Sequence, residues 1–283
     1  MAILSGYRPG ARLALIILLA ASCPAQAGPA PEGAATFSIL GYDPATGEIG
    51  GAIQSHVFSV GNGLLWARAG VGAVVVQAIA DVSYGPRSLE LLERGLPVDE
   101  VVRRVHDEDP DLWRHAWPKT SRQFAVIDAE GRHAAFTGAR VAAWAGHASG
   151  RYATAQGNLL ASEDVVNEMI HAFEETGGHL AERLVAALHA GQAAGGDVRG
   201  MQSAALIIVK KDGGIWLNND VVMRLQVDDH PDPIGELGRL VGLALEAHHR
   251  MEALRRAVEG AESARDETHD GADPGAASWK PAK

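Results

Sequence analysis

The stretch TFSILGYDPATGEIGGAIQS, residues 36–55, decides the fold class. It contains two short apolar runs on either side of DPATGE, in which Pro44 and Gly47 are turn-forming residues. Short runs rich in Ile, Phe and Tyr that are separated by Asp, Pro and Gly are typical of strands joined by tight turns. The stretch therefore predicts two antiparallel strands, the first of which begins at Thr36.

Patterns typical of strands and of helices follow along the rest of the chain. Further strands are expected at 64–70, 71–78, 122–131, 133–138, 141–146, 151–158, 202–214 and 215–227. Apolar residues at three- and four-residue spacing predict helices at 84–95, 97–109, 163–176, 179–196 and 234–258. Strand groups and helix groups alternate without a repeating βαβ unit, so we expect one α+β domain with helices layered on antiparallel sheets. We place this domain at residues 36–256 and expect the polar remainder, 257–283, to be disordered.

Composition and charge restrict the classes of function that the protein can have. The chain has 283 residues, is 47% hydrophobic and carries a formal net charge of −10. Nucleic-acid binding needs clustered Lys and Arg to displace counterions, and no such cluster is visible, so nucleic acid is excluded as a partner.

The first residues predict export. Arg8 and Arg12 precede the short apolar run LALIILLAAS, and an Ala-x-Ala site follows at 25–27. A basic start, an apolar run of about ten residues and such a site are typical of a secretory signal, whereas a membrane span needs roughly twenty residues. We expect a signal peptide at 1–27, a linker or propeptide at 28–35 and a periplasmic or secreted protein. Cys23 is an alternative lipid anchor, which would make the protein a lipoprotein.

Motifs for metal and nucleotide chemistry are missing from the sequence. It has no H-E-x-x-H, C-x-x-C, G-x-S-x-G or phosphate-binding loop, so no metal and no cofactor are predicted. The acidic stretch DDHPDP, residues 228–233, could hold a hard metal ion, but its prolines and its place before a helix favour a capping loop.

Several blocks of the sequence carry a family resemblance: TFSILGYDPATGEIGGAIQSHVFSVG, WARAGVGAVVVQA, QGNLL, AGQAAGGDVRGMQSAALIIV and VDDHPDPIGEL. Together they resemble the uncharacterised bacterial family called domain of unknown function 1028, from Thr36 to roughly Leu245. That family is placed in the Ntn-hydrolase (N-terminal nucleophile) superfamily. The resemblance implies a four-layer αββα sandwich, in which two antiparallel sheets lie between helices.

The resemblance also implies a catalytic role for Thr36. In Ntn-hydrolases the first residue of the mature chain is the nucleophile, and its own α-amine is the base. An α-amine has a pKa of roughly 7.7 to 8.0, so a useful fraction is unprotonated near neutral pH. Any residue left before Thr36 would turn this amine into an amide and abolish the base. The alternative is that Thr36 is a β-branched residue that starts an edge strand.

Four further residues are catalytic candidates by their position relative to Thr36. Ser55 ends the second strand and is expected to orient the α-amine. Arg68 falls where related threonine hydrolases have a lysine, although its alternative is a structural ion pair. Gln77 and Asn158 are candidate oxyanion donors, or amides that satisfy buried backbone groups. His56 follows Ser55 and points to the opposite face, so we expect it in a loop or at the surface.

The candidate substrate-binding residues are Asp197, Arg199, Gln202 and Ser203, which lie in or next to the block GGDVRGMQSAAL. Two functions follow. One is an exported amidohydrolase that acts on a small amide or peptide-like substrate. The alternative is a catalytically inactive, peptidoglycan-associated binding module with the same fold. Related folds often form oligomers, so a homo-oligomer is a further expectation.

Overall fold

The computed structural model describes residues 36–269, with side chains described for residues 36–261. The predicted signal peptide, the linker at 28–35, the candidate lipid anchor Cys23 and the end of the predicted tail lie outside the described residues. Among the helices of the described part, none is long and apolar enough to span a bilayer.

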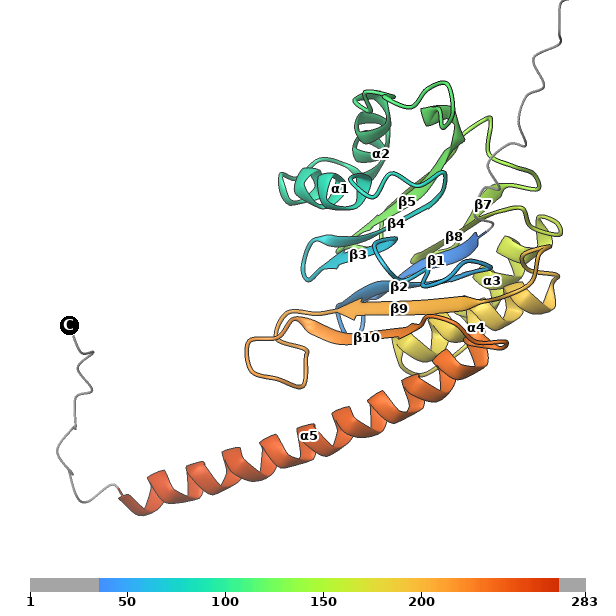
Figure 1. Cartoon of the computed structure of the whole chain (residues 1–283). Coiled ribbons are helices and arrows are strands. Elements are labelled where there is room, and N and C mark those ends of the chain that lie inside the picture. The colour runs from blue at the N-terminus through green and yellow to red at the C-terminus, as the bar shows by residue number, and fades with distance from the viewer. Residues whose placement is uncertain (1–35, 270–283) are drawn as a thin grey trace, which may run out of the picture. The chain divides into compact units, whose positions relative to one another are not determined.

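Ten described strands form two antiparallel sheets (Figure 1). The larger sheet has the order β10-β9-β2-β1-β8-β7. Its strands are β1 (Thr36–Asp43), β2 (Glu48–Ser55), β7 (Gly146–Ser149), β8 (Ala153–Asn158), β9 (Ser203–Val209) and β10 (Val221–Val227). The smaller sheet has the order β3-β4-β5-β6 and consists of β3 (Leu65–Arg68), β4 (Gly72–Ala78), β5 (Arg122–Asp128) and β6 (His133–Thr137).

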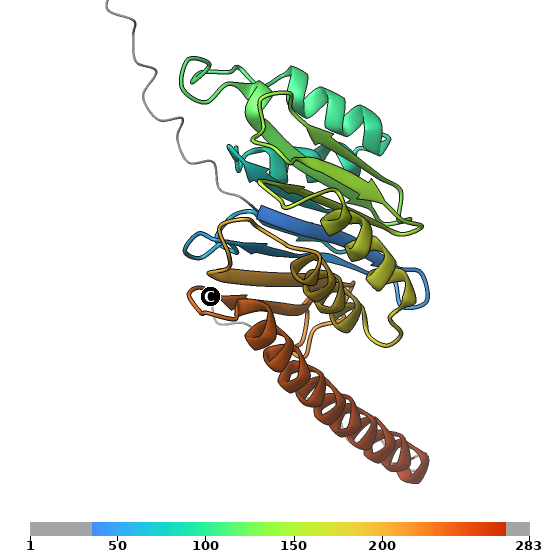
Figure 2. The same cartoon turned by 90° about the vertical axis from the view of Figure 1, so that its right-hand side faces the viewer.

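Helices cover the outer face of each sheet (Figures 1 and 2). The smaller sheet packs against α1 (Tyr84–Glu93) and α2 (Val98–Asp107). The larger sheet packs against α3 (Asp164–Glu175), α4 (Leu180–Ala193) and α5 (Pro233–His269). A short 3₁₀ turn, Lys119–Ser121, precedes β5.

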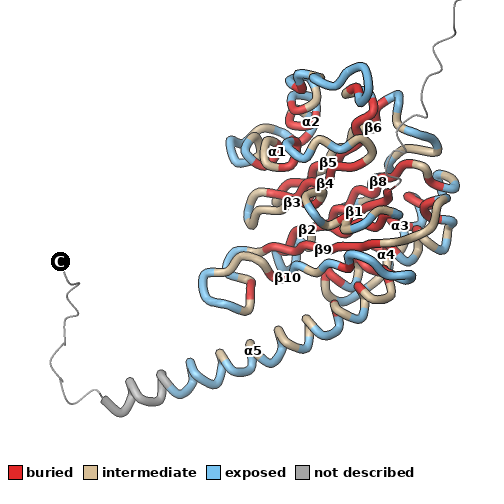
Figure 3. The backbone as a smooth tube through the Cα atoms, viewed as in Figure 1, coloured by how far each residue is buried: buried red, intermediate tan, exposed pale blue. Residues whose placement is uncertain are grey.

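Three apolar cores lie between the layers of helices and sheets, because successive side chains along each strand point to opposite faces of its sheet. On β1, Phe37 and Ile39 pack with the helices α3 and α4, whereas Leu40 faces the core between the two sheets. On β4, Val74 and Val76 pack with α1 and α2. Figure 3 shows that the buried residues are concentrated in the strands. The predicted α+β class and sheet sandwich are thus confirmed.

Two predicted strands differ from the structure. The strand expected at 141–146 is absent, and β7 begins only at Gly146. The carbonyls of Ala142 and Trp144 instead accept hydrogen bonds from the backbone of residues 159 and 160, so this segment is hydrogen-bonded to the chain just after β8. The strand expected from residue 215 begins at Val221, because Asn218 adopts a positive φ of 56° within an intervening turn.

The last helix is longer than expected. It continues to His269, through residues that the sequence analysis assigned to the disordered tail. Residues 257–269 are rich in Ala and Glu, which have high helix propensity and can extend a helix without an apolar face.

Candidate active site

Thr36 is the first residue of β1, and β1 lies between β2 and β8. In the strand register, Thr36 is opposite Ser55 on one side and Asn158 on the other. Its hydroxyl oxygen Oγ1 lies 3.0 Å from Ser55 Oγ, within hydrogen-bond distance. Both side chains are fully buried. The structure therefore brings together the predicted nucleophile, Ser55 and Asn158 at one end of the larger sheet.

Gln77 reaches the same place from the smaller sheet. Its Nε2 donates to the backbone oxygen of Thr36 at 3.4 Å and to Gln123 Oε1 at 2.8 Å. Its Oε1 accepts from Ser38 Oγ at 2.5 Å. The side-chain amide of Gln77 therefore links the two sheets directly behind Thr36.

Gln123 of β5 is the centre of the polar contacts between the sheets. Besides Gln77, its Oε1 accepts from Asn158 Nδ2 at 3.0 Å. Its Nε2 lies within hydrogen-bond distance of Thr137 Oγ1 at 3.0 Å, of the Gly146 oxygen at 3.2 Å and of the Gly157 oxygen at 2.8 Å.

Gln156 of β8 completes this cluster, since its Nε2 donates to Ser38 Oγ at 2.7 Å and to the Ser38 oxygen at 3.1 Å. We call the buried set Ser38, Gln77, Gln123, Gln156 and Asn158 the inter-sheet amide network. All five side chains are neutral, and each residue is at most 1% exposed. Each of them makes hydrogen bonds inside the protein, as buried polar groups require.

Ser38, Gln123 and Gln156 were not among the predicted site residues. The two-residue alternation in the sequence could have identified them. In β8, polar Thr154, Gln156 and Asn158 alternate with small residues, and in β5 Gln123 is on the same face as Ala125 and Ile127. A glutamine on a strand face that is otherwise apolar indicates a polar partner across the core.

The segment that follows α4 crosses the head of β1. Asp197 forms an isolated bridge with Leu160, which follows β8. The Asp197 Oδ2 atom accepts from the backbone nitrogen of His56, which follows β2, at 3.3 Å. Because β1 lies between β2 and β8, this loop passes the end of the strand at which Thr36 begins.

Asp197 and Arg199 are paired within this loop. The carboxylate of Asp197 has a fully buried side chain and accepts from Arg199 Nη2 at 2.9 Å. It also accepts from the backbone nitrogen of Arg199 at 2.8 Å. The side chain of Arg199 is 25% exposed, so it faces solvent beside the predicted nucleophile. His56 is exposed, as predicted, and its Nδ1 lies 3.3 Å from the oxygen of Met201.

Ser203 and Gln202 hold neighbouring segments in place. Ser203 is opposite Ser55 in the register, and its Oγ donates to the Val57 oxygen at 2.6 Å and accepts from Val60 N at 3.0 Å. Gln202 Nε2 donates to Asp229 Oδ1 at 3.1 Å. Both side chains therefore fix the loops around the Thr36 end of the sheet.

The structure does not bring Arg68 to this site. Arg68 is opposite Gly72 in the β3–β4 register, whereas Gln77 lies at the other end of β4. At about 3.4 Å per residue, these two positions are roughly 17 Å apart. Arg68 Nη1 instead donates to Glu93 Oε2 at 2.7 Å in an exposed ion pair, which is the structural alternative. The antiparallel register, which the sequence does not specify, explains the error.

The acidic stretch 228–233 caps α5. Asp232 Oδ1 accepts from the Gly235 nitrogen at 3.0 Å, while Asp228 and Asp229 bond to Ser59 and Gln202 respectively. Within residues 36–261, whose side chains the structure describes, no three His, Cys, Asp or Glu side chains gather as a metal site would require.

Comparison with known proteins gives a family and a related structure. A model described as a family of unknown function, DUF1028, matches residues 36–237. A crystal structure of a Silicibacter pomeroyi protein that carries the same family model is similar, with a TM-score of 0.66 and 32% sequence identity. The match covers 74% of this chain and 89% of that one. No curated protein matches the chain. The matched region begins at Thr36 and includes both sheets and the start of α5, and the chain therefore belongs to the DUF1028 family.

Proposed function

We propose that this protein is an exported N-terminal-nucleophile amidohydrolase in which Thr36 attacks the carbonyl carbon of an amide bond. The observation that supports it best is the placement of Thr36. The residue is the first of the family match and of β1, and its hydroxyl lies 3.0 Å from that of Ser55. The proposal also rests on the leader-like residues 1–27, with Cys23 as the alternative lipid anchor, and on the resemblance to Ntn-hydrolases.

Cleavage of the peptide bond before Thr36 would convert its backbone nitrogen into an α-amine. With a pKa of roughly 7.7 to 8.0, that amine accepts the proton of Thr36 Oγ1 as the oxygen attacks. Ser55 Oγ is close enough to hold the hydroxyl in position. An ester then forms between Thr36 and the acyl group, and the leaving amine takes the proton from the α-ammonium. Water hydrolyses the ester and regenerates the hydroxyl.

The negative charge on the carbonyl oxygen needs hydrogen-bond donors. We assign this role to the amides of Gln77, which contacts the Thr36 backbone from the smaller sheet, and Asn158, which is opposite Thr36 on β8. Gln77 Nε2 now donates to Thr36 O and to Gln123, so it has to exchange one of these partners during the reaction. Losing one such donor costs roughly 2.7 to 4 kcal/mol of barrier.

We place the substrate next to the loop that contains Asp197 and Arg199. Arg199 is partly exposed, and a guanidinium binds carboxylates and carbonyl oxygens well. Its ion pair with the buried Asp197 carboxylate would hold it in a fixed orientation. A small amide or peptide with an acidic group fits this arrangement.

The test compares purified proteins that begin at Thr36 and at Ala35 against a library of acyl amino acids and short peptides. The proposal predicts hydrolysis only by the chain that begins at Thr36, with activity that rises with pH through roughly 7.7 to 8.0. Thr36→Ala should abolish it, and Ser55→Ala should lower kcat roughly ten- to hundredfold without unfolding the protein. Ser149→Ala, an exposed serine of the same sheet, is the matched control. Equal activity of the chain that begins at Ala35 would refute the mechanism.

A second candidate is a catalytically inactive, peptidoglycan-associated binding module. The inactivity is supported by the complete burial of Thr36 and Ser55 and by the internal hydrogen bonds of the amides around them, whereas the peptidoglycan association rests on the family resemblance alone. For this function we expect co-sedimentation with peptidoglycan that Thr36→Ala leaves unchanged, and no hydrolysis by any form of the chain. Hydrolysis that depends on Thr36 would exclude it.

A further inference from the structure

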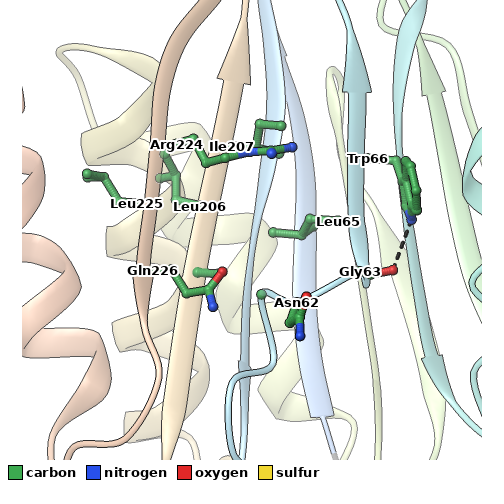
Figure 4. Close-up of a pocket in the computed structure, with 11 residues that line it drawn as sticks. Asn62, Gly63, Leu65, Trp66, Leu206, Ile207, Arg224, Leu225 and Gln226 are labelled. Atoms are coloured by element: carbon green, nitrogen blue, oxygen red, sulfur yellow. Dashed lines mark hydrogen bonds between the residues drawn. The ribbon is translucent and has the colours of Figure 1, made fainter.

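A cavity of about 240 Å³ lies at one edge of the sandwich, on the face of β10 that points toward the smaller sheet (Figure 4). In the register, Arg224 is opposite Ile207 and Gln226 is opposite Ala205, so all four side chains share one face. The smaller sheet has fewer strands, and its edge strand β3 lies over β2 and β9. Ala205 and Ile207 are therefore buried, whereas Arg224 and Gln226 remain exposed.

The loop between β2 and β3 forms a fixed wall of this cavity. Ser59 N donates to the Asp228 oxygen at 2.9 Å, and Ser59 Oγ donates to Asp228 Oδ1 at 2.7 Å. At Gly61, a Cβ atom would lie 2.5 Å from Ala205 Cβ and 2.6 Å from Gln226 Oε1. Only glycine allows the loop to approach β9 and β10 so closely. The wall is thus preformed.

Leu65 of β3 supplies the opposite, apolar wall, because its side chain belongs to the core between the sheets. The ring of Trp66, the next residue, is on the other face of β3 and packs on α1, because a Cβ atom at Gly85 would lie 2.2 Å from Trp66 Cδ1. Its indole nitrogen Nε1 donates to the Gly63 oxygen at 3.0 Å, which ties the loop at the rim of the cavity to β3 (Figure 4). Leu65 and Ile207 together give the cavity its apolar surface.

The charge of the cavity is positive although the protein is acidic. Among the described residues that line it, Arg224 is the one ionisable side chain. No described residue forms a hydrogen bond or ion pair with its guanidinium, and Figure 4 shows the side chain extending from β10 toward Ile207. Asn62 adds an exposed amide that likewise has no described partner. Guanidinium nitrogens match the two oxygens of a carboxylate.

We propose that this cavity binds a small monocarboxylate with an apolar body. The carboxylate pairs with Arg224, and the body lies against Leu65 and Ile207. The volume of 240 Å³ equals roughly eight water molecules at about 30 Å³ each, which suits a ligand on the order of ten to twelve non-hydrogen atoms. A phosphate dianion brings more charge than one guanidinium balances. Site and ligand are independent of Thr36.

The test uses the full chain and 4-phenylbutyrate as the probe, in a titration followed by NMR. The indole N–H signal of Trp66, assigned with Trp66→Phe, should shift on binding, with a Kd of a few millimolar or lower. The neutral 4-phenylbutyramide should bind at least tenfold more weakly, and inorganic phosphate should not displace the acid. Equal binding of the amide, or displacement by phosphate, would overturn the assignment.

Variants locate the site. Arg224→Gln should weaken binding roughly ten- to hundredfold, the range for a hydrogen bond to a charged group. Arg256→Gln, an exposed arginine on α5, is the matched control and should bind like the wild type. If Arg224→Gln lowers the melting temperature, Asn62→Trp fills the cavity from an exposed position and should abolish binding. Unchanged affinity in the folded Arg224→Gln or Asn62→Trp protein refutes the site. Thr36→Ala should bind normally, which separates this proposal from the proposed hydrolase.

Discussion

Gln123 connects the two sheets through a single side chain. Its amide bonds to Gln77 on β4 and Asn158 on β8, and its nitrogen contacts carbonyls on β7 and β8. Apolar packing between the sheets specifies their offset less strictly than directional hydrogen bonds do, so these bonds help to fix one alignment. The position of Gln77 behind Thr36 therefore depends on a residue that does not contact Thr36 itself.

Replacing Gln123 with Leu should destabilise the protein by roughly 3 to 5 kcal/mol, because several buried donors and acceptors lose their partner at once. Urea unfolding followed by circular dichroism measures this change. Thr137→Val removes one hydrogen bond to the same amide and should cost only about 1 kcal/mol. Similar losses in the two variants would show that the network is not centred on Gln123.

At the residue scale, the sequence predicted which side chains gather around Thr36 but not how they are bonded. Ser55, Gln77 and Asn158 could be placed from strand ends together with the family resemblance, and Asp197 could be placed from the block GGDVRG. Arg68 was misplaced, because its distance from Gln77 depends on the register of a hairpin. Gln123 was missed, because its role requires knowing which faces of two distant strands meet.

At the scale of elements, α4 packs closely on its neighbours through Gly191. A Cβ atom at this position would lie 2.7 Å from Met169 Cγ of α3 and 3.4 Å from Phe37 Cε2 of β1. The helix-breaking tendency of glycine is thus offset by the close packing that it allows between helices and sheet.

Gly191→Ala should lower the free energy of unfolding by roughly 1 to 3 kcal/mol, since overpacking outweighs the gain in helix propensity. Gly242→Ala, in an open part of α5 with no atom within 4 Å of the added methyl group, should raise it by roughly 0.5 to 1 kcal/mol. Thermal melts of the pair give the comparison. Stabilisation by both substitutions would contradict the packing described here.

A buried charge cluster joins α1 and the end of α2 to the smaller sheet. Tyr84 OH donates to Asp109 Oδ2 at 2.7 Å, and Arg122 Nε lies 3.4 Å from the same oxygen. Burial raises the pKa of the Asp109 carboxyl, but hydrogen bonds from Tyr84 and Asp111 and the charge of Arg122 lower it, with a net decrease. Burial and the nearby Asp109 raise the pKa of Tyr84, so the phenol stays neutral.

A lowered folded-state pKa means that Asp109 stabilises the fold above its unfolded pKa, about 3.9, and that this stabilisation is lost as the pH falls through the folded-state pKa. Asp109→Asn should therefore cost about 3 kcal/mol or more at pH 7, because Arg122 stays buried without its anionic partner. The difference from wild type should shrink below about pH 4. Urea midpoints at pH 7, 4 and 3 test this, with the exposed Glu108→Gln as a control of much smaller effect. A constant difference across this range would exclude the ionised carboxylate as the cause.

Most elements could be predicted from turn residues and periodicity, and their order is that of the structure. The exceptions have local physical causes. The segment 141–146 has apolar residues like a strand, but its carbonyls accept hydrogen bonds from the backbone that follows β8. Residues 257–269 of α5 lack an apolar stripe, so hydrophobic periodicity did not indicate a helix there. The helix propensity of Ala and Glu did.

At the scale of the whole molecule, the sandwich separates the two proposed sites. The Thr36 end is buried and held by amides, whereas the β10 edge is open and carries Arg224. The β10 edge is open because the larger sheet has six described strands and the smaller sheet has four. In the sequence, the only sign of this open edge is an arginine and a glutamine in an otherwise apolar strand. The four layers could be expected from the family resemblance, but the open edge could not.

The central claim is that removal of residues 1–35 creates the base that activates Thr36. Its most direct test is the intact mass of the protein purified in active form from cells that express the whole chain. The account predicts a mass that corresponds to a chain beginning at Thr36. An active preparation whose mass still includes residues before Thr36, whether it begins at Gly28 or at a lipidated Cys23, would contradict it.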